Sequence, residues 1–471
     1  MTRLRSCILG AMVIFLFSPL YSHAQVVTTL ADLSGYDGFS LTSLIQGRDA
    51  SYYGASAGEV DGALYRITAA GRLRDLHVFT EDFGTTPTAV LLGVDGNLYG
   101  TTDNGGADFL GSIFKLTPSG SFSTVYSFTG RGDGSAPMGG LIAGADGNFY
   151  GTTYGGANGY GTVFEVSPAG SLTTLHVFNY NDGASPSGVI QGVDGRFYGT
   201  TSYGGNLNCV VSDLLSGCGV VFSVDSAGNF SLLHEFNSTD GATPYAGLLQ
   251  ASDGHFYGTT AIGGDPTCQC GTVFRISSRG SLHTIYEFRE MNDGGFPLAP
   301  MIQATDGAVY GTTTGNGVLE CTPTNSCGSI FRIAPGGKFT TLYSFCLQSG
   351  CPDGLWPHAG LLQSTSGLMY GTTSEGGGPC SCGTVFTLNM NLQPFVTFVN
   401  RAGKVGASVQ ILGQDLTGAS AVSFNGVPAI FNVISDTFLK AVVPVGATSG
   451  PVMVTTTSGM LTSNIPFRVR R

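Results

Sequence analysis

Short apolar runs, rich in β-branched and aromatic residues, recur along the chain and are separated by polar, glycine-containing turns. Residues 248–288 show the pattern most clearly, because they contain four such runs. The turns between them are Asp253-Gly254, Gly263-Gly264 and Arg279-Gly280. Runs of this length bounded by Asp-Gly and Gly-Gly are typical of β-strands joined by tight turns. The stretch therefore predicts one four-stranded antiparallel sheet.

The same order of motifs repeats from end to end. The tetrad Tyr-Gly-Thr-Thr begins six of the repeats, at Tyr99, Tyr150, Tyr198, Tyr257, Tyr310 and Tyr370. A degraded copy at residues 53–56 precedes them, so the repeat occurs seven times at spacings of 46 to 60 residues. A period near 50 with four strands per unit is typical of a β-propeller. We predict an all-β fold with a seven-bladed β-propeller over residues 25–390.

The two ends of the repeat region complement each other. Residues 25–33 resemble a fourth strand that has no repeat of its own, whereas the seventh repeat stops at Asn389 without a fourth strand. Pairing the two would remove open sheet edges, which are sites of aggregation. We therefore expect the N-terminal strand to complete the last blade and close the ring.

The repeat ends near residue 390 and a different β-rich pattern follows. Residues 394–471 contain alternating runs such as 407–413, 427–433 and 452–456, which fit a small immunoglobulin-like β-sandwich. We expect this second unit to fold as a module distinct from the repeats.

Both regions resemble known families. The repeat, with its DGxxP, YGTT and GTVF motifs, is similar to the GloVer repeat of Gloeobacter and Verrucomicrobia. That resemblance covers residues 25–390 and implies export, with no assigned catalytic residues. Residues 394–471 resemble an IPT/TIG domain through Gly413, residues 422–426 and residues 443–450. Such domains act as spacers or accessory modules.

The N-terminus has the features of a secretory signal. Arg3 and Arg5 precede the apolar run 8–16, and residues 22–24 form a small-x-small cleavage site, so residues 1–24 are expected to be a signal peptide. We expect an exported protein that is secreted, periplasmic or at the cell surface, with no membrane span in the mature chain. A net charge of −11 makes nucleic acid an unsuitable partner.

Cysteine usage agrees with export. Ten cysteines remain after the signal, and an even number in an exported chain predicts disulfides. The metal alternative is weaker, because no histidine accompanies the C-x-C pairs at ligand spacing. The cysteines, whose C-x-C pairing stays open, are Cys209, Cys218, Cys268, Cys270, Cys321, Cys327, Cys346, Cys351, Cys380 and Cys382.

The loops are predicted to divide between two faces. Tight Asp-Gly turns join strands 1 and 2, whereas the strand 2–3 loops and the connections between repeats are longer, more varied and hold every mature cysteine. Variable loops on a rigid ring are where sites are usually built. Aromatic residues on these loops suit sugar rings, although they could instead pack their own loops. The candidates for ligand binding are Trp356, Tyr154, Tyr203, Tyr245 and Phe296.

One aspartate per DGxxP connection forms a second candidate set. Five such carboxylates on one face could hold calcium, but an Asx turn followed by a stiffening proline is the favoured interpretation. No other cofactor is expected. The speculative calcium ligands are Asp133, Asp182, Asp240, Asp293 and Asp353.

Function is constrained less than fold, because propellers host enzymes and binding proteins alike. Residues 54–58 match G-x-S-x-G, but a nucleophile elbow needs a strand-to-helix turn, and no helix is evident. No acid pair stands out for glycoside hydrolysis. We predict no catalytic residue and a non-catalytic binding protein for an extracellular glycan, a polysaccharide or a surface protein. The alternatives are a polysaccharide-active hydrolase or lyase, and a structural envelope component.

Overall fold

The fold is all-β. The structure is a computed structural model that describes residues 27–33, 40–57, 62–80, 86–156, 158–212, 215–289, 293–315, 327–379 and 381–470. Within these ranges, one 3-10 turn, η1 (Leu416–Gly418), occurs and no α-helix does. None of this part of the chain forms a helix long and apolar enough to cross a lipid bilayer. The expected signal peptide, residues 1–24, lies outside the described residues.

The described residues of the repeats form seven antiparallel sheets of at least four strands, numbered here as repeat sheets 1 to 7 along the chain. Sheet 1 contains β2 (Ser40–Leu41), β3 (Ile45–Gln46), β4 (Tyr52–Ala57), β5 (Ala63–Ile67) and β6 (Leu73–Val78). Sheet 2 contains β7 (Pro87–Leu92), β8 (Leu98–Thr102), β9 (Ser112–Leu116) and β10 (Phe122–Ser127). Sheet 3 contains β11 (Leu141–Ala143), β12 (Phe149–Thr153), β13 (Thr162–Val166) and β14 (Leu172–Val177).

The remaining repeat sheets follow the same order. Sheet 4 contains β15 (Ala184–Gln191), β16 (Phe197–Tyr203), β19 (Val220–Val224) and β20 (Phe230–Glu235). Sheet 5 contains β21 (Leu249–Gln250), β22 (Phe256–Thr260), β23 (Thr272–Ile276) and β24 (Leu282–Glu287). Sheet 6 contains β25 (Ile302–Gln303), β26 (Val309–Thr313), β27 (Ser329–Ile333) and β28 (Phe339–Ser344). Sheet 7 contains β29 (Leu362–Gln363), β30 (Met369–Thr373), β31 (Thr384–Leu388) and β1 (Val27–Asp32).

The YGTT tetrad of repeat sheets 2 to 7 has a structural role, as sheet 5 illustrates. The Tyr257 hydroxyl donates to Asp253 in the preceding tight turn, at 2.8 Å. A side chain at Gly258 would collide with the ring of Phe274 on β23, so glycine makes room for the core aromatic residue. Thr260 is buried and shares a hydrogen bond with Thr272 across the two strands. The motif therefore encodes packing within one sheet, which explains why it recurs.

The N-terminal strand pairs with the last repeat, as its pattern predicts. β1 runs antiparallel to β31, with Val27 opposite Leu388 and Asp32 opposite Thr384. Leu30 and Leu33 pack against a core that also contains Tyr370 and other residues of sheets 1 and 7. Residues more than 350 positions apart in the sequence thus form one sheet.

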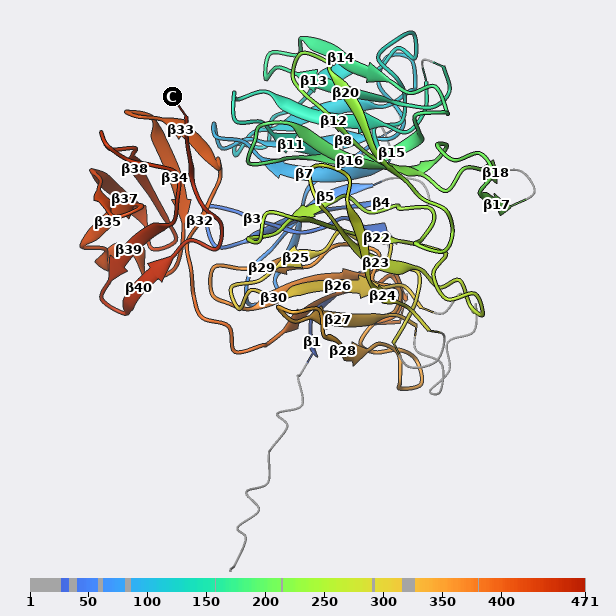
Figure 1. Ribbon diagram of the computed structural model, residues 1–471. Helices are drawn as coiled ribbons and strands as arrows, with labels where there is room; N and C mark the ends of the chain where they lie inside the picture. Colours follow the sequence, from blue (N-terminus) through green and yellow to red (C-terminus); the bar gives the residue numbers. More distant parts are fainter. Residues whose placement is uncertain are drawn as a thin grey trace, which may run out of the picture.

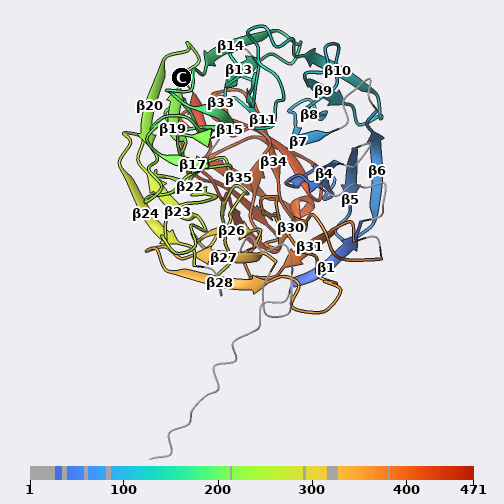
Figure 2. The same cartoon turned by 90° about the vertical axis from the view of Figure 1, so that its right-hand side faces the viewer.

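The repeat sheets follow one another around a ring (Figure 2). Apolar cores lie between consecutive sheets; one of them combines Tyr198 and Val221 of sheet 4 with Phe256 and Phe274 of sheet 5. Glutamines at the ends of first strands accept backbone N–H bonds from the neighbouring sheet. In each pair the first residue donates its backbone N–H to the side-chain oxygen of the second: Ala145 to Gln191, Val193 to Gln250, Ser252 to Gln303, Thr305 to Gln363, and Thr365 to Gln46.

The C-terminal residues form a separate set of sheets beside the ring, coloured orange to red at the left of Figure 1. One sheet contains β32 (Thr397–Phe398), β34 (Ser408–Leu412), β38 (Phe438–Val442) and β37 (Phe431–Ser435). Another contains β36 (Val427–Pro428), β35 (Ala421–Phe424), β39 (Val452–Thr456) and β40 (Gly459–Thr462). A parallel pair joins β33 (Ala402–Lys404) to β41 (Arg468–Arg470). Their inner faces share one apolar core that includes Phe398, Val409, Phe424 and Phe467.

Candidate ligand-binding face

The two faces of the ring differ in what covers them. The C-terminal strands contact the face that carries the tight strand 1–2 turns. Thr437 donates to the carbonyl oxygen of Arg48 at 2.8 Å, and Gln410 donates to that of Val94 at 2.5 Å. Arg468 reaches the carbonyl oxygen of Gly192 at 3.5 Å. The opposite face, turned toward the viewer in Figure 2, carries the longer loops and leaves them uncovered by these strands.

Four tyrosines from consecutive repeats meet on this loop face, and we call Tyr154, Tyr180, Tyr203 and Tyr245 the tyrosine cluster. The hydroxyls of Tyr203 and Tyr245 share a hydrogen bond, and their rings meet edge to face with centroids 6.3 Å apart. Tyr154 and Tyr245 are 36% and 40% exposed, so both rings can be reached from solvent. The cluster joins loops of sheets 3, 4 and 5 into one patch.

The other hydroxyl groups of the cluster affect the ionisation of Tyr203. Burial raises the pKa of Tyr203, and the hydrogen bond with Tyr245 together with the nearby hydroxyls of Tyr154 and Tyr180 raises it further. The Tyr203 phenol therefore stays protonated at neutral pH and can both donate and accept hydrogen bonds. Aromatic faces beside hydroxyl donors suit the apolar faces and hydroxyl edges of a sugar.

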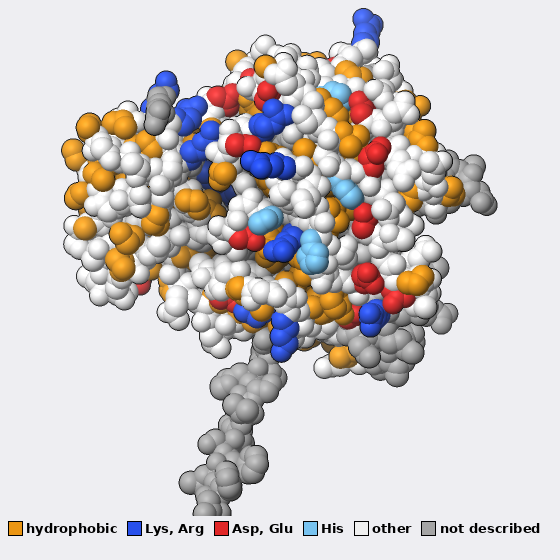
Figure 3. Space-filling model, viewed as in Figure 1, with side chains coloured by type: hydrophobic (Ala, Val, Ile, Leu, Met, Phe, Trp, Pro, Cys, Tyr) orange, Lys and Arg blue, Asp and Glu red, His pale blue; other side chains and the backbone are white. Residues whose placement is uncertain are grey.

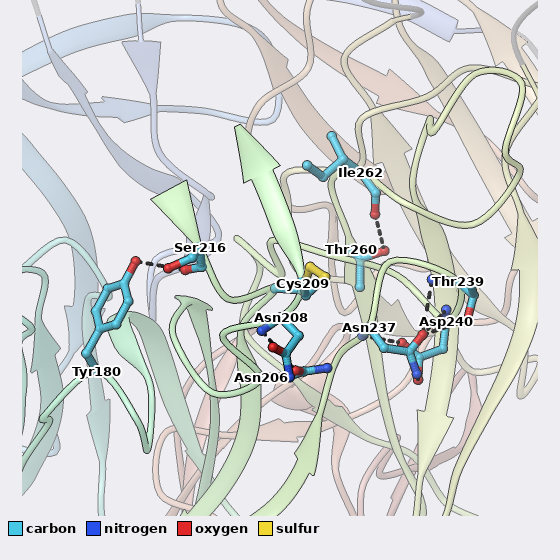
Figure 4. The surroundings of a disulfide bond; sticks show 11 residues. Tyr180, Asn206, Asn208, Cys209, Ser216, Asn237, Thr239, Asp240, Thr260 and Ile262 are labelled. Carbon is cyan, nitrogen blue, oxygen red and sulfur yellow. Dashed lines mark hydrogen bonds between the residues drawn. A yellow bond between two sulfur atoms is a disulfide. The ribbon is translucent and has the colours of Figure 1, made fainter. Parts of the chain in front are cut away.

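A disulfide-bonded loop forms one side of the cluster (Figure 4). Cys209 and Cys218 are bonded, and between them lie the short strands β17 (Val210–Ser212) and β18 (Leu215–Ser216). The Tyr180 hydroxyl donates to the carbonyl oxygen of Ser216 at 2.7 Å, which fixes its ring against this loop. Tyr160 lies on the other side of Tyr180, with ring centroids 5.0 Å apart.

Amide side chains lie near the same disulfide. Figure 4 shows Asn206, Asn208 and Asn237 around Cys209. The Asn208 N–H donates to the Asn206 side chain at 3.2 Å, and Asn208 is exposed. Asparagine side chains offer both a donor and an acceptor, which complements the hydroxyls of the tyrosine cluster.

The predicted aromatic residues divide into two groups. Tyr154, Tyr203 and Tyr245 come together in the tyrosine cluster, whereas Trp356 and Phe296 lie in other loops. Each of those two is half-buried, has φ of +54° and precedes the proline of its DGxxP motif. Trp356 packs against the core that contains Cys327 and Cys346. Sequence reasoning missed Tyr180, which is marked only by its place between two asparagines before a DG motif.

The five DGxxP aspartates are not brought together. Each carboxylate accepts a backbone N–H from its own connection and a hydroxyl or imidazole from its own outer strand. The outer-strand partners are Tyr126 for Asp133, His176 for Asp182, His234 for Asp240, Tyr286 for Asp293 and Tyr343 for Asp353. Among the described residues, no group of three or more His, Cys, Asp and Glu side chains could hold a metal ion. Calcium binding there stays a prediction, and an ion would have to compete with these bonds.

These partners also explain why tyrosine and histidine alternate in the outer strands. Both can donate to an aspartate: Tyr126 reaches Asp133 at 2.8 Å, and His234 reaches Asp240 at 3.0 Å. Burial opposes ionisation of Asp133, but bonds from Thr129 and Tyr126 outweigh it and lower its pKa. The aspartates are thus anchors for the connections between repeats.

The disulfides follow the predicted local pattern. Besides the bond at Cys209, disulfides join Cys268 to Cys270 and Cys346 to Cys351. Cys327 and Cys382 each take part in a further disulfide. The predicted cysteines Cys321 and Cys380 lie outside the described residues. The serine of the G-x-S-x-G match, Ser56, is fully buried within β4, opposite Ala63 of β5, and not at a strand-to-helix turn.

The fold and the motifs define an all-β tandem-repeat protein with blade-like sheets. The chain belongs to the Gloeobacter/Verrucomicrobia repeat family, which matches residues 12–212 and 207–427. No curated protein matches the chain.

Solved structures show a distant likeness. A protein proposed to be a gluconolactonase aligns at 10% identity and a TM-score of 0.39, over 79% of this chain and 94% of that one. A gluconolactonase from Xanthomonas campestris aligns at 13% and 0.40, over 70% and 90%. A protein from Lactobacillus plantarum aligns at 16% and 0.41, over 64% and 83%. Similarity at this level does not indicate what this chain binds.

Proposed function

We propose that the repeats form a closed seven-bladed β-propeller and that residues 394–471 form an immunoglobulin-like module of the IPT/TIG type. Seven consecutive sheets, the pairing of β1 with β31 and the bond between Gln46 of sheet 1 and Thr365 of sheet 7 support closure. Two sheets around one apolar core support the sandwich.

On this scaffold, we propose a secreted or cell-surface protein that binds a glycan without chemically changing it. The tyrosine cluster carries the proposal, because the solvent-accessible ring of Tyr245 meets Tyr203 at the end of β16, beside further hydroxyl and amide groups. The disulfide between Cys209 and Cys218 holds this patch in place, which lowers the entropy lost on binding.

A glycan array probed with the chain from residue 25 onward tests the proposal. We expect retention of a subset of glycans, and the Tyr245→Ala variant should bind them roughly tenfold more weakly, the effect of losing one aromatic contact of about 1.4 kcal/mol. Phe109→Ala is the matched control, because Phe109 is an aromatic residue 69% exposed on a loop of sheet 2. It should leave binding within twofold of the original.

Other outcomes would overturn the proposal in different ways. A bound polysaccharide that becomes shorter with time would favour the hydrolase or lyase alternative. A blank array from a protein with a cooperative thermal melt would favour a protein partner or an envelope scaffold. Equal losses from Tyr245→Ala and Phe109→Ala would remove the tyrosine cluster as the site.

A further inference from the structure

A groove of about 500 Å³ lies between repeat sheets 5 and 6, beside their tight turns and away from the tyrosine cluster. Its polar lining includes Ser252, Arg275 and His283, and its apolar lining includes Ile285, Ile333 and Pro335. Figure 3 shows histidine side chains beside Lys or Arg side chains near the middle of this side of the ring. Its volume falls in the usual range for small-ligand sites.

Two basic side chains lie next to each other on one wall of the groove. Arg275 on β23 is directly opposite His283 on β24, and both are exposed. Such a pair is unfavourable when both groups are charged, unless an anion lies between them. In sheet 6, Arg332 faces Thr340 instead. Sheet 1 also has two basic residues opposite each other, Arg66 and Arg74, but there Arg66 forms an ion pair with Asp49 at 2.6 Å.

The tight-turn aspartate of sheet 5 does not form an ion pair with Arg275. In sheet 6, the equivalent Asp306 accepts from Tyr310 at 2.9 Å and also forms an ion pair with Arg332 at 2.8 Å. Asp253 of sheet 5 accepts from Tyr257 at 2.8 Å and also lines the groove. Among the described residues, Arg275 forms no ion pair; its side chain lies near the Tyr257 hydroxyl.

The opposite wall is unusually open. The turn between β27 and β28 contains Gly336 and Gly337, where the same turn in other repeats has a serine, alanine or arginine before its glycine. A side chain added at Gly336 would meet no atom within 4 Å, so the glycine leaves the wall bare. Behind it, Val309 and Ile333 are almost fully buried and form an apolar floor.

The C-terminal strands leave this sector accessible. Their hydrogen bonds to the ring reach Arg48, Val94, Gly192 and Thr365, which belong to sheets 1, 2, 4 and 7. In the described part of the chain, none reaches sheet 5 or sheet 6. The exposed pair of Arg275 and His283 and the bare turn at Gly336 therefore coincide at one uncovered groove.

We propose that this groove binds a uronate unit of an acidic polysaccharide, with its carboxylate between Arg275 and His283. A guanidinium matches a carboxylate with two parallel hydrogen bonds, and the imidazole adds a further donor. The apolar floor covers one face of the sugar ring, and the Ser252 hydroxyl is placed for a sugar hydroxyl. A free phosphate ion would leave that floor bare. This site is independent of the glycan site proposed on the loop face.

Binding measurements with three soluble polymers test the inference: polygalacturonate, dextran sulfate and neutral dextran. With the chain from residue 25 onward, we expect polygalacturonate to bind most tightly and neutral dextran not to bind. Arg275→Gln should weaken polygalacturonate binding at least tenfold, and His283→Gln several-fold. Both residues are exposed, so the thermal melts of the variants should stay unchanged.

Arg279→Gln is the matched control, because it removes the same charge from an exposed residue of the adjoining turn that does not line the groove. It should change binding less than twofold. Equal losses from Arg275→Gln and Arg279→Gln would indicate diffuse electrostatic attraction and overturn the site. Tighter binding of dextran sulfate would overturn the carboxylate assignment, and no binding of either anionic polymer would overturn both. Tyr245→Ala should leave polygalacturonate binding unchanged, which separates this site from the loop face.

Discussion

Two arcs of the ring are held together differently on the tight-turn face. In sheets 4 to 7 and in sheet 1, a glutamine at the end of the first strand accepts a backbone N–H from the preceding sheet, as Gln303 does from Ser252 at 2.8 Å. These sheets form the glutamine-linked arc. Sheets 2 and 3 have Leu92 and Ala143 at that position instead. The Arg48 side chain joins sheets 1 and 2 there, donating to the carbonyl oxygens of Gly93 and Val94.

The arc without glutamines is also where the C-terminal strands make close contact. Phe438 lies against the Arg48 guanidinium, 5.1 Å from ring centroid to Cζ. Gln410 donates to the carbonyl oxygen of Val94, beside the Arg48 side chain. The C-terminal residues also form hydrogen bonds with Thr365 of sheet 7 and Gly192 of sheet 4, so their contacts extend into the glutamine-linked arc.

Removing the closing strand should have the largest effect, because it opens both arcs. Deletion of residues 25–33 removes the pairing of β1 with β31 and the packing of Leu30 and Leu33. We expect a loss of roughly 5 kcal/mol or more from buried apolar surface and strand hydrogen bonds. Circular dichroism melts should show one cooperative transition at a temperature at least about 10 °C lower. An unchanged melting temperature would contradict closure by this strand.

Single substitutions in the two arcs should differ in how much they lower the free energy of unfolding and in which strands they affect. Arg48→Ala removes two inter-sheet hydrogen bonds and the contact with Phe438, so we expect a loss of about 2 kcal/mol. Gln303→Leu, which copies the residue of sheet 2, should cost about 1 kcal/mol. Urea unfolding measures both.

Hydrogen exchange separates the two substitutions further. Arg48→Ala should speed exchange of amides in β38, because it removes a contact of that strand, whereas Gln303→Leu should leave β38 unchanged. Arg72→Ala is a control for the loss of a surface arginine, because Arg72 lies in a strand 3–4 turn of sheet 1. Equal effects on β38 from Arg48→Ala and Gln303→Leu would contradict the distinction between the arcs.

The smallest expected effect is a pH dependence within the glutamine-linked arc. Burial opposes ionisation of Asp306, but the hydrogen bond from Arg332, with those from the Ala308 N–H and Tyr310, outweighs it and lowers the pKa of Asp306. A carboxylate with a lowered pKa stabilises the fold above its ordinary pKa of about 3.9, and this stability is lost as pH falls through the folded-state value. Asp306→Asn should therefore cost about 1 kcal/mol at pH 7, and this cost should shrink as the pH falls below about 3.9. A difference in urea midpoint that does not shrink on acidification would contradict this.

Much of the fold could be predicted from the sequence because its hydrogen bonds are local. Tyr257 bonds to Asp253 four residues earlier, and Cys209 bonds to Cys218 nine residues later. The closing strand could also be predicted, because an unpaired first strand and an incomplete last repeat are both visible in the sequence. On the loop face, Tyr154, Tyr203 and Tyr245 could be proposed as exposed aromatic residues from their place in the connections.

Only the tertiary structure decided which of these residues meet. Trp356 and Tyr245 flank the proline of the same motif, yet Trp356 packs beside a disulfide and Tyr245 bonds to Tyr203 at the end of β16 in sheet 4. The contact of Gln410 with Val94 joins residues 316 positions apart, and no local signal encodes it. The sequence by itself determined the strands, the turns and the local character of the disulfides, but not the C-x-C pairing, because those features depend on neighbours along the chain. The tertiary structure decided the covered face, the tyrosine cluster and the groove, because those depend on how consecutive sheets pack and on where the C-terminal strands bind the ring.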